Sequence, residues 1–107
     1  MNARDLTDVD RIVHAPARLL IMTLLSGADV DFVYLLRETG LSKGNLAAHL
    51  GRLEESGYVG AKKEGRGAGS RTTYTLTKAG RDAFSRYREQ LRRIVEETAP
   101  GTRLEPG

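Results

Sequence analysis

The chain has 107 residues and a mass of 11.7 kDa, which is the size of one domain. Hydrophobic residues make up 39% of it and charged residues 29%, enough apolar material for one small core. Cysteine is absent, which excludes disulfides, thiolate metal sites, iron–sulfur clusters and cysteine nucleophiles. The first residues are charged, with no signal-peptide pattern, and no apolar run could cross a membrane, so we expect a cytoplasmic protein without membrane contact.

Positive charge is concentrated in the second and third parts of the chain. Residues 1–40 carry four arginines and six acidic residues, a net charge of −2. Residues 41–75 carry six basic and three acidic residues, a net of +3, and residues 76–107 carry seven and five, a net of +2. An acidic polymer is the natural partner of such a surface, although a solvated basic face would give the same distribution.

Two helices are predicted near the N-terminus. Thr7, with Asp10 three residues later, fits a capping box and predicts a short helix from Asp8 to His14. Pro16 suits the first turn of a second helix, which we expect to run from Pro16 to Leu25. Because this second segment is apolar nearly all round, we expect it to form the buried centre of the fold.

The next two helices are separated by a very short turn. Asp31 can cap a helix from Phe32 to Thr39, which Gly40 would end in the left-handed conformation. Ser42 can cap a further helix that runs to about Ser56. The apolar residues of this helix recur at helical spacing: Leu46, Ala47, Leu50 and Leu53. A three-residue turn with glycine between two helices is typical of helix-turn-helix geometry.

After Gly57 the pattern changes from a helical to a two-residue period. Residues 58–64 and 71–76 predict the two strands of a hairpin, joined by a glycine-rich loop. Thr77 can cap a long final helix to about Thr98, and we expect a flexible tail over residues 99–107. This order of elements predicts an α+β, mainly α fold, a winged helix-turn-helix with a two-stranded wing, over residues 1–98.

Three segments resemble one protein family. Residues 41–59, LSKGNLAAHLGRLEESGYV, resemble the recognition helix and wing entry of small MarR/ArsR-like winged-helix transcriptional regulators. Residues 71–81, RTTYTLTKAGR, resemble the family's second wing strand and final-helix start, and residues 14–18, HAPAR, resemble its entry into the second helix. The resemblance covers about residues 8–95. It implies a homodimer that binds double-stranded DNA with its fourth helix in the major groove.

The outer face of the predicted fourth helix, about residues 42–56, suits close approach to a duplex. With its leucines directed inward, Gly44, Ala48 and Gly51 point outward, although glycine costs about 1 kcal/mol inside a helix. Phosphates favour the N–H groups at a helix N-terminus, and the first turn of such a helix contacts bases. The predicted DNA-binding residues of this helix are Ser42, Lys43, Gly44, Asn45, Ala48, His49 and Arg52.

Each of these residues also has a purely structural interpretation. Ser42 can be a helix cap without contacting DNA, and Lys43 can be an ordinary solvated lysine. The glycines can result from sequence drift that the helix tolerates. As DNA contacts, Lys43 would reach guanine O6 and N7, and Asn45 would pair with adenine or bond a phosphate. His49 fits either a groove contact or a half-buried structural histidine, and Arg52 suits a phosphate better than a base.

The hairpin carries basic residues around three glycines, and predicts a wing over about residues 62–71 on the DNA backbone or in the minor groove. The alternative is an ordinary basic hairpin. The Gly-x-Gly-x-Gly string joins two strands and opens no helix, so it lacks the context of a dinucleotide-binding loop. The predicted wing contacts are Lys62, Lys63, Arg66 and Arg71.

The final helix predicts a dimer interface. Its apolar residues are spaced by three, four and three positions, nearly two heptads of a coiled-coil seam. A helix of about 20 residues is roughly 30 Å long, which exceeds so small a domain, so the overhang is expected to pair with a second chain. One part of the seam must also cover the domain core. The predicted interface residues are Phe84, Tyr87, Leu91, Ile94 and Val95.

No motif supports catalysis. The two histidines lie far apart without a carboxylate at ligand spacing, and we predict neither an enzyme, a metal site nor a cofactor. A winged-helix module that binds protein or RNA is the alternative function. The strands offer no aromatic platform for RNA beyond Tyr58 and Tyr74, and a basic recognition helix and wing disfavour a purely protein partner. The resemblance also implies a small-molecule, metal or oxidant effector, and the lack of cysteine disfavours thiolate sensing.

Overall fold

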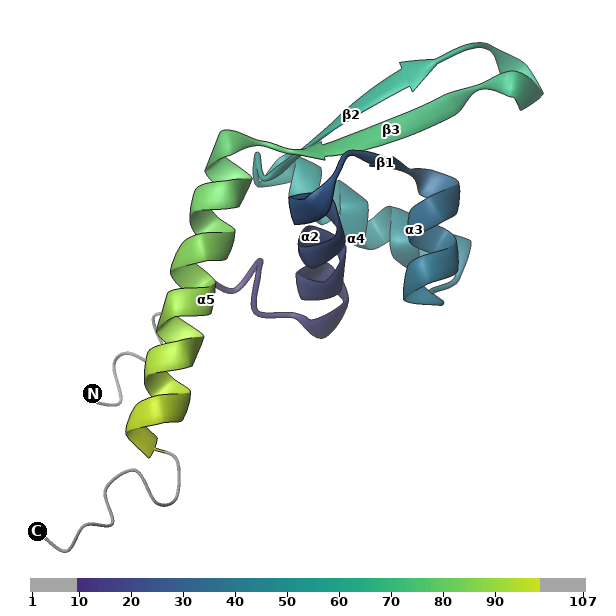
Figure 1. The fold of residues 1–107 in the computed structure, drawn as a ribbon. Helices are drawn as coiled ribbons and strands as arrows, with labels where there is room; N and C mark the ends of the chain where they lie inside the picture. Colours follow the sequence, from purple (N-terminus) through teal and green to yellow (C-terminus); the bar gives the residue numbers. More distant parts are fainter. Residues whose placement is uncertain (1–9, 99–107) are drawn as a thin grey trace, which may run out of the picture.

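A computed structural model describes residues 10–98, so the predicted cap Thr7 and the predicted tail over residues 99–107 lie outside the described residues. The α-helices are α2 (Pro16–Gly27), α3 (Phe32–Thr39), α4 (Lys43–Glu55) and α5 (Lys78–Thr98). The strands are β1 (Val30–Asp31), β2 (Val59–Glu64) and β3 (Arg71–Leu76), with the 3-10 turn η1 (Gly67–Gly69) before β3. Figure 1 shows α2, α3 and α4 grouped on one side of the sheet, α5 at one end, and the β2–β3 hairpin projecting from the other. This confirms the winged helix-turn-helix fold.

The predicted first helix is wrong for the part of it that the structure describes. Residues 10–15 form a turn, in which Asp10 Oδ1 accepts hydrogen bonds from the backbone N–H groups of Ile12 at 2.9 Å and Val13 at 3.3 Å. An aspartate that bonds its own following backbone competes with helix formation. Ala15, before Pro16, is extended with φ −148° and ψ 122°, as the residue before proline prefers. The turn therefore ends where α2 begins.

The sheet has three strands rather than the predicted two, in the order β1-β3-β2 with antiparallel neighbours. The two-residue β1 pairs Val30 with Tyr74 and Asp31 with Thr73. A strand this short has no alternating pattern in the sequence, and only its distant partner defines it. The third strand ties the start of α3 to the base of the hairpin.

The predicted caps of α3 and α5 and the predicted end of α3 are confirmed, whereas α2 continues to Gly27, past its predicted end at Leu25. Asp31 Oδ1 accepts a hydrogen bond from Tyr34 N at 2.8 Å, and Gly40 ends α3 in the left-handed conformation with φ 70°. Thr77 Oγ1 accepts from Gly80 N at 3.0 Å at the start of α5. Gly80 is required there, because a Cβ atom would lie 2.1 Å from the Tyr58 carbonyl oxygen. This close approach seats the start of α5 against the entry of β2.

The core lies between the helices and one face of the sheet. Residues with at most 1% exposure come from the turn before α2 and from each of the four helices: Val13, Ile21, Met22, Leu25, Leu35, Leu46, Leu50, Leu53 and Ala83. Tyr74 and Leu76 of β3 are also buried, as their alternation predicts. Leu20 is 41% exposed, so α2 is not buried all round, and Ala47 of α4 is exposed too. Within residues 10–98, no helix combines the length and apolar character needed to cross a membrane.

Candidate nucleic-acid interface

The first turn of α4 is exposed on a helix that is firmly anchored. Ser42 Oγ accepts a hydrogen bond from Asn45 N at 3.1 Å, which confirms its predicted role as helix cap. Lys43 and Asn45 are exposed, while the opposite face of α4 places its leucines in the core. The cap uses the backbone of Asn45 and leaves its side-chain amide available. The structure therefore holds two polar side chains on a rigid helix N-terminus, where the sequence predicts base contacts.

The outer face of α4 consists of small residues that the fold itself does not require. Gly44 and Ala48 are exposed and Gly51 is half-buried. A Cβ atom at Gly44 or at Gly51 would meet nothing within 4 Å. Neither glycine is needed for packing inside this chain. A Cβ atom at either position would instead extend into open space.

His49 has a structural partner that sequence reasoning missed. It is half-buried, and its Nδ1 lies 3.2 Å from Nη1 of Arg18 on α2. Arg18 in turn donates from Nε to the carbonyl oxygen of Ile12 at 2.7 Å. The only signal in the sequence was the HAPAR segment, which contains Arg18 but does not indicate its partner. Arg52, one turn further along α4, is exposed.

Glu54, near the end of α4, lies close to the sheet. Burial raises the pKa of Tyr74 on β3, and the carboxylate of Glu54 raises it further. Glu54 is therefore close enough to the sheet to act on a β3 side chain.

The hairpin register divides the predicted wing residues between two faces. Lys63 pairs with Thr72 and shares its face with the Ala61–Tyr74 pair, the face that packs on the helices. Lys62 pairs with Thr73 on the opposite face. Arg66 lies in the loop between the strands, and all four predicted wing residues are exposed. The hairpin thus presents cations on both of its faces and at its tip.

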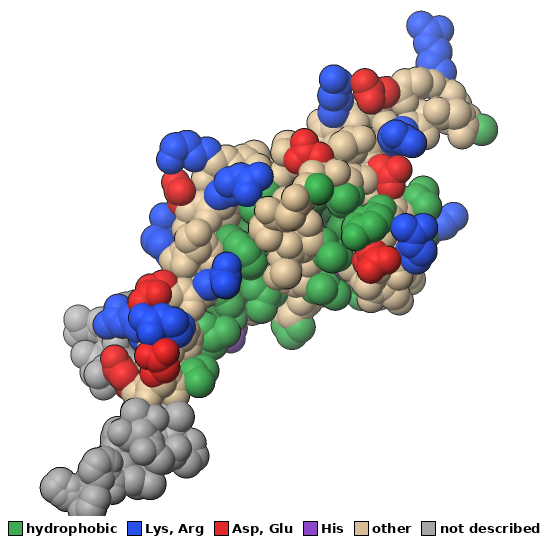
Figure 2. Space-filling view, in the orientation of Figure 1, with side chains coloured by type: hydrophobic (Ala, Val, Ile, Leu, Met, Phe, Trp, Pro, Cys, Tyr) green, Lys and Arg blue, Asp and Glu red, His purple; other side chains and the backbone are tan. Residues whose placement is uncertain are grey.

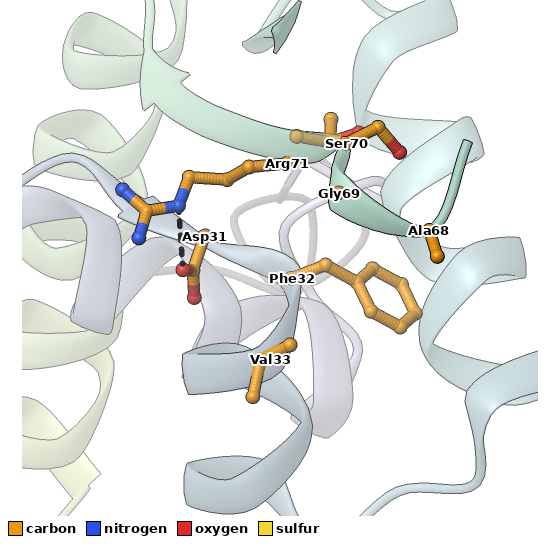
Figure 3. A pocket seen from close by; sticks show the side chains of 8 residues that line it. Asp31, Phe32, Val33, Ala68, Gly69, Ser70 and Arg71 are labelled. Atoms are coloured by element: carbon orange, nitrogen blue, oxygen red, sulfur yellow. Dashed lines mark ion pairs between the residues drawn. The ribbon is translucent and has the colours of Figure 1, made fainter. Parts of the chain in front are cut away.

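Two of the four wing cations are already paired with acidic side chains. Lys62 Nζ lies 3.7 Å from Glu64 Oε2, and Arg71 Nε lies 3.4 Å from Asp31 Oδ2. Figure 3 shows the second pair beside the hollow between α3 and the end of the wing, lined also by Phe32, Val33 and Ala68. Among residues 10–98, neither Lys63 nor Arg66 forms an ion pair. Figure 2 shows lysine and arginine side chains along the hairpin and α5, with hydrophobic side chains at the surface between them.

The apolar seam of α5 is divided along its length. Phe84 and Tyr87 are 7% and 4% exposed and belong to the core of their own chain. Leu91 and Val95 are 38% and 55% exposed on the part of the helix that extends past the core. Ile94 is half-buried. Only the second half of α5 therefore has exposed apolar residues for the predicted interface, because the seam residues of the first half are buried in their own chain.

A polar cluster connects the turn at residues 10–15 to the rest of the domain. The Tyr58 hydroxyl donates to Asp10 Oδ2, and this hydrogen bond raises the pKa of Tyr58. His14 Nδ1 lies 2.8 Å from the Tyr87 hydroxyl on α5. In the described part of the chain, no group of three or more His, Asp or Glu side chains is arranged to hold a metal. The cluster is structural: it positions the N-terminal turn against β2 and α5.

Comparison with known proteins finds a family match over most of the chain. Residues 17–95 match the sequence model of a family described as winged helix DNA-binding domain. An uncharacterised protein from Methanocaldococcus jannaschii is 37% identical over 78 residues, which cover 72% of this chain and 85% of that protein. The match includes α2 to α4 and the wing and most of α5.

Solved structures of transcriptional regulators share the fold. A transcriptional regulator homologue from Pyrococcus horikoshii superposes with a TM-score of 0.82 at 26% identity, covering 91% of this chain and 99% of that one. A PadR-family regulator from Clostridium difficile gives 0.66 at 21% identity, covering 75% and 91%. A MarR-family regulator from Porphyromonas gingivalis gives 0.65 at 23% identity, covering 80% and 84%. Because the PadR-family and MarR-family structures are less than 25% identical to this chain, their similarity shows a shared fold alone.

Proposed function

Because this chain belongs to the family of winged helix DNA-binding domains, we propose that it is a homodimeric DNA-binding transcriptional regulator. In this proposal α4 enters the major groove, and the wing over residues 62–71 contacts the backbone or the minor groove. The observation that carries the proposal is the first turn of α4, where Lys43 and Asn45 are exposed on a helix fixed by its cap and its buried leucines. A contact that distinguishes bases needs this rigidity, because a bidentate hydrogen bond tolerates little displacement.

The small residues of α4 support insertion into a groove. The major groove of B-DNA is about 12 Å wide, so it admits a helix whose leading face is not bulky. Gly44 and Ala48 present no side chain beyond a methyl group on this face. Backbone N–H groups at the start of the helix would then approach the phosphates, with the favourable end of the helix dipole toward them.

The wing supports an electrostatic contact with the same duplex. Lys63 and Arg66 are exposed and have no acidic partner in the described part of the chain, so a phosphate would meet them without breaking an ion pair. Each cation that neutralises a phosphate releases condensed counterions, which favours binding at low salt. Lys62 and Arg71 would each have to give up an ion pair, with Glu64 and Asp31 respectively, before binding a phosphate.

The second half of α5 supports dimerisation. Leu91 and Val95 form an exposed apolar strip, and half-buried Ile94 lies between them in sequence. Three charged side chains of this part of the helix pair with one another: Arg92 Nη1 lies 2.7 Å from Glu96 Oε1, and Arg92 also bonds Glu89. Charges that neutralise each other within one helix leave the apolar strip free to pack on a second copy.

The test of DNA binding is selection of bound duplexes from a random pool. We expect enrichment of a near-palindrome with half-sites about one helical turn, roughly 10 base pairs, apart, because a two-fold dimer presents two copies of α4. An enriched site without two-fold symmetry would contradict the dimeric arrangement. A protein that retains no duplex at low salt would contradict the proposed DNA-binding function, whether it retains single-stranded RNA or no nucleic acid at all.

The test of dimerisation is the mass in solution by light scattering at tens of micromolar. We expect a dimer for the wild type and a monomer for Leu91→Glu, which places a charge in the apolar strip. Ser85→Glu, an exposed position on the same helix, is the matched control and should remain dimeric. A wild-type monomer, or a Leu91→Glu dimer, would contradict the assignment of α5.

A further inference from the structure

Arg18, in the first turn of α2, lies between the N-terminal turn and α4. Its Nε donates to the Ile12 carbonyl oxygen at 2.7 Å, and its Nη2 donates to the Arg11 carbonyl oxygen at 3.4 Å. These two backbone contacts hold the guanidinium from one side. On its other side Nη1 lies 3.2 Å from Nδ1 of His49. The half-buried Arg18 side chain is thus fixed by two backbone carbonyl groups and directed at the Nδ1 atom of His49 on α4.

This contact determines the chemical form of His49. A guanidinium carries five N–H donors and no acceptor, and it stays protonated. Nδ1 of His49 must therefore accept the hydrogen bond, which requires a lone pair on that nitrogen. The ring is then the neutral tautomer with its hydrogen on Nε2. Within residues 10–98, the Nε2–H group has no hydrogen-bond acceptor.

The position of His49 on α4 indicates what this donor meets. His49 follows Asn45 by four residues and precedes Arg52 by three, so the three side chains follow one flank of the helix. Asn45 and Arg52 are exposed at the two ends of this flank. Base contacts come from the N-terminal residues of such a helix, and residues further along its flank meet the sugar-phosphate backbone. A phosphate oxygen is therefore the acceptor that suits His49.

We propose, on the premise of the DNA-binding function above, that Arg18 is a positioning residue that holds His49 as a neutral Nε2–H donor to a phosphate oxygen. A neutral donor fixes the register of α4 on the duplex without releasing counterions. Loss of this contact therefore lowers affinity by the same factor at every salt concentration. That behaviour separates His49 from the wing cations, whose loss must change the salt dependence itself.

The first test is the tautomer of His49 in the free protein, measured by two-bond nitrogen–proton correlation NMR at mildly alkaline pH. We expect the hydrogen on Nε2 in the wild type, and a mixture of tautomers in Arg18→Met. A wild-type ring with its hydrogen on Nδ1, or with hydrogens on both nitrogens, would overturn the inference. This test needs no DNA, so it holds whether or not the proposed function is correct.

The second test is the affinity of full-length variants for the selected duplex across a salt series. His49→Asn keeps an acceptor for Arg18 but is too short to replace Nε2, and we expect about tenfold weaker binding with an unchanged salt slope. His49→Gln places an amide donor near the position of Nε2 and should recover most of this loss. Arg18→Met should lose a similar factor, and the double variant Arg18→Met with His49→Asn should lose no more than either alone.

Arg11→Met is the matched control for Arg18→Met. It removes the same charge from the adjacent turn, but the Arg11 side chain is exposed and forms no hydrogen bond or ion pair within the described residues. It should bind like the wild type, and circular-dichroism melting checks that each variant is folded.

Wild-type affinity in folded His49→Asn would overturn the inference and leave the proposed function standing. A loss confined to one base pair of the site would overturn the assignment to phosphate. Absence of binding by the wild type would contradict the proposed function instead.

Discussion

Helix α4 and the wing carry the two sets of predicted DNA contacts, but they are built differently. α4 has three leucines with at most 1% exposure, a satisfied N-cap and a side-chain link to α2. In the wing every residue from Ala61 to Gly69 is exposed. The hairpin is held by its strand pairing and by the buried residues at its base, Val59 and Tyr74. One element is part of the core, and the other projects from it (Figure 1).

In the proposed function, this difference divides base recognition and phosphate attraction between the two elements. Distinguishing bases depends on the angle and distance of individual hydrogen bonds, so it belongs on an element that the core fixes. Attraction to phosphate acts over about a Debye length and tolerates displacement, so it can be carried by an exposed hairpin. Small side chains, Gly44 and Ala48, lie beside Lys43 and Asn45 on α4, and the wing carries four exposed cations.

The largest expected effect is a difference between α4 and the wing in their contribution to the free energy of unfolding. Leu50→Ala should reduce the free energy of unfolding by about 2–5 kcal/mol, because it removes a buried side chain that anchors α4 in the core. Lys63→Ala on the wing should change it by less than about 0.5 kcal/mol. Urea unfolding followed by circular dichroism measures both. Equal destabilisation by the two variants would show that the wing is as much a part of the core as α4.

The next effect concerns the outer face of α4. Gly44→Gln should weaken binding to the selected duplex by more than about 100-fold, since it obstructs the contacts of both Lys43 and Asn45 in each subunit, each worth about 1–3 kcal/mol. The folded protein should keep its stability, because a Cβ atom there meets nothing within 4 Å. Fluorescence anisotropy and thermal melting measure the two quantities.

Gly27→Gln is the matched control for this effect, as it adds the same side chain at an equally open glycine of α2. It should not change DNA affinity. Full affinity in stable Gly44→Gln would show that this face does not enter the groove.

A smaller effect should distinguish base recognition from positioning. Asn45→Ala should weaken binding to the selected duplex by about 1–3 kcal/mol per lost base contact and leave random-duplex binding nearly unchanged. The helix cap survives this change because Ser42 bonds the backbone N–H of residue 45. Competition between selected and random duplexes measures the ratio. An equal loss on both duplexes would make Asn45 a phosphate contact.

The smallest effect concerns the wing and is measured as a salt slope. Arg66→Ala should reduce the slope of log affinity against log salt by about 2 per dimer, one phosphate contact in each subunit. Arg71→Ala should reduce it less, because Arg71 is already paired with Asp31 at 3.4 Å. A wild-type slope in Arg66→Ala would remove the wing tip from the interface. A larger change in Arg71→Ala than in Arg66→Ala would show that the pair with Asp31 opens on binding.

Much of the architecture follows from local sequence signals. Asp31, Ser42 and Thr77 each cap a helix by bonding a backbone N–H three residues later, and Gly40 ends α3 through its left-handed conformation. The strand Arg71–Leu76 has the predicted bounds and alternates as expected. These signals act within a few residues of chain, so they are visible without the fold. The candidate interface on α4 was predictable for the same reason, because it lies on one face of one helix.

Contacts between distant residues were decided by the packed chain alone. Val30 becomes a strand residue only because Tyr74 lies beside it, and Arg18 meets His49 across 31 positions of sequence. The Asp10 carboxylate accepts hydrogen bonds from the backbone of Ile12 and from the Tyr58 hydroxyl, and the structure has a turn where the pattern predicts a helix. The seam of α5 has one periodicity, yet Phe84 is buried and Val95 is exposed, because the core ends partway along the helix. Periodicity indicates which face of a helix is apolar, whereas only packing determines which part of that face another element covers.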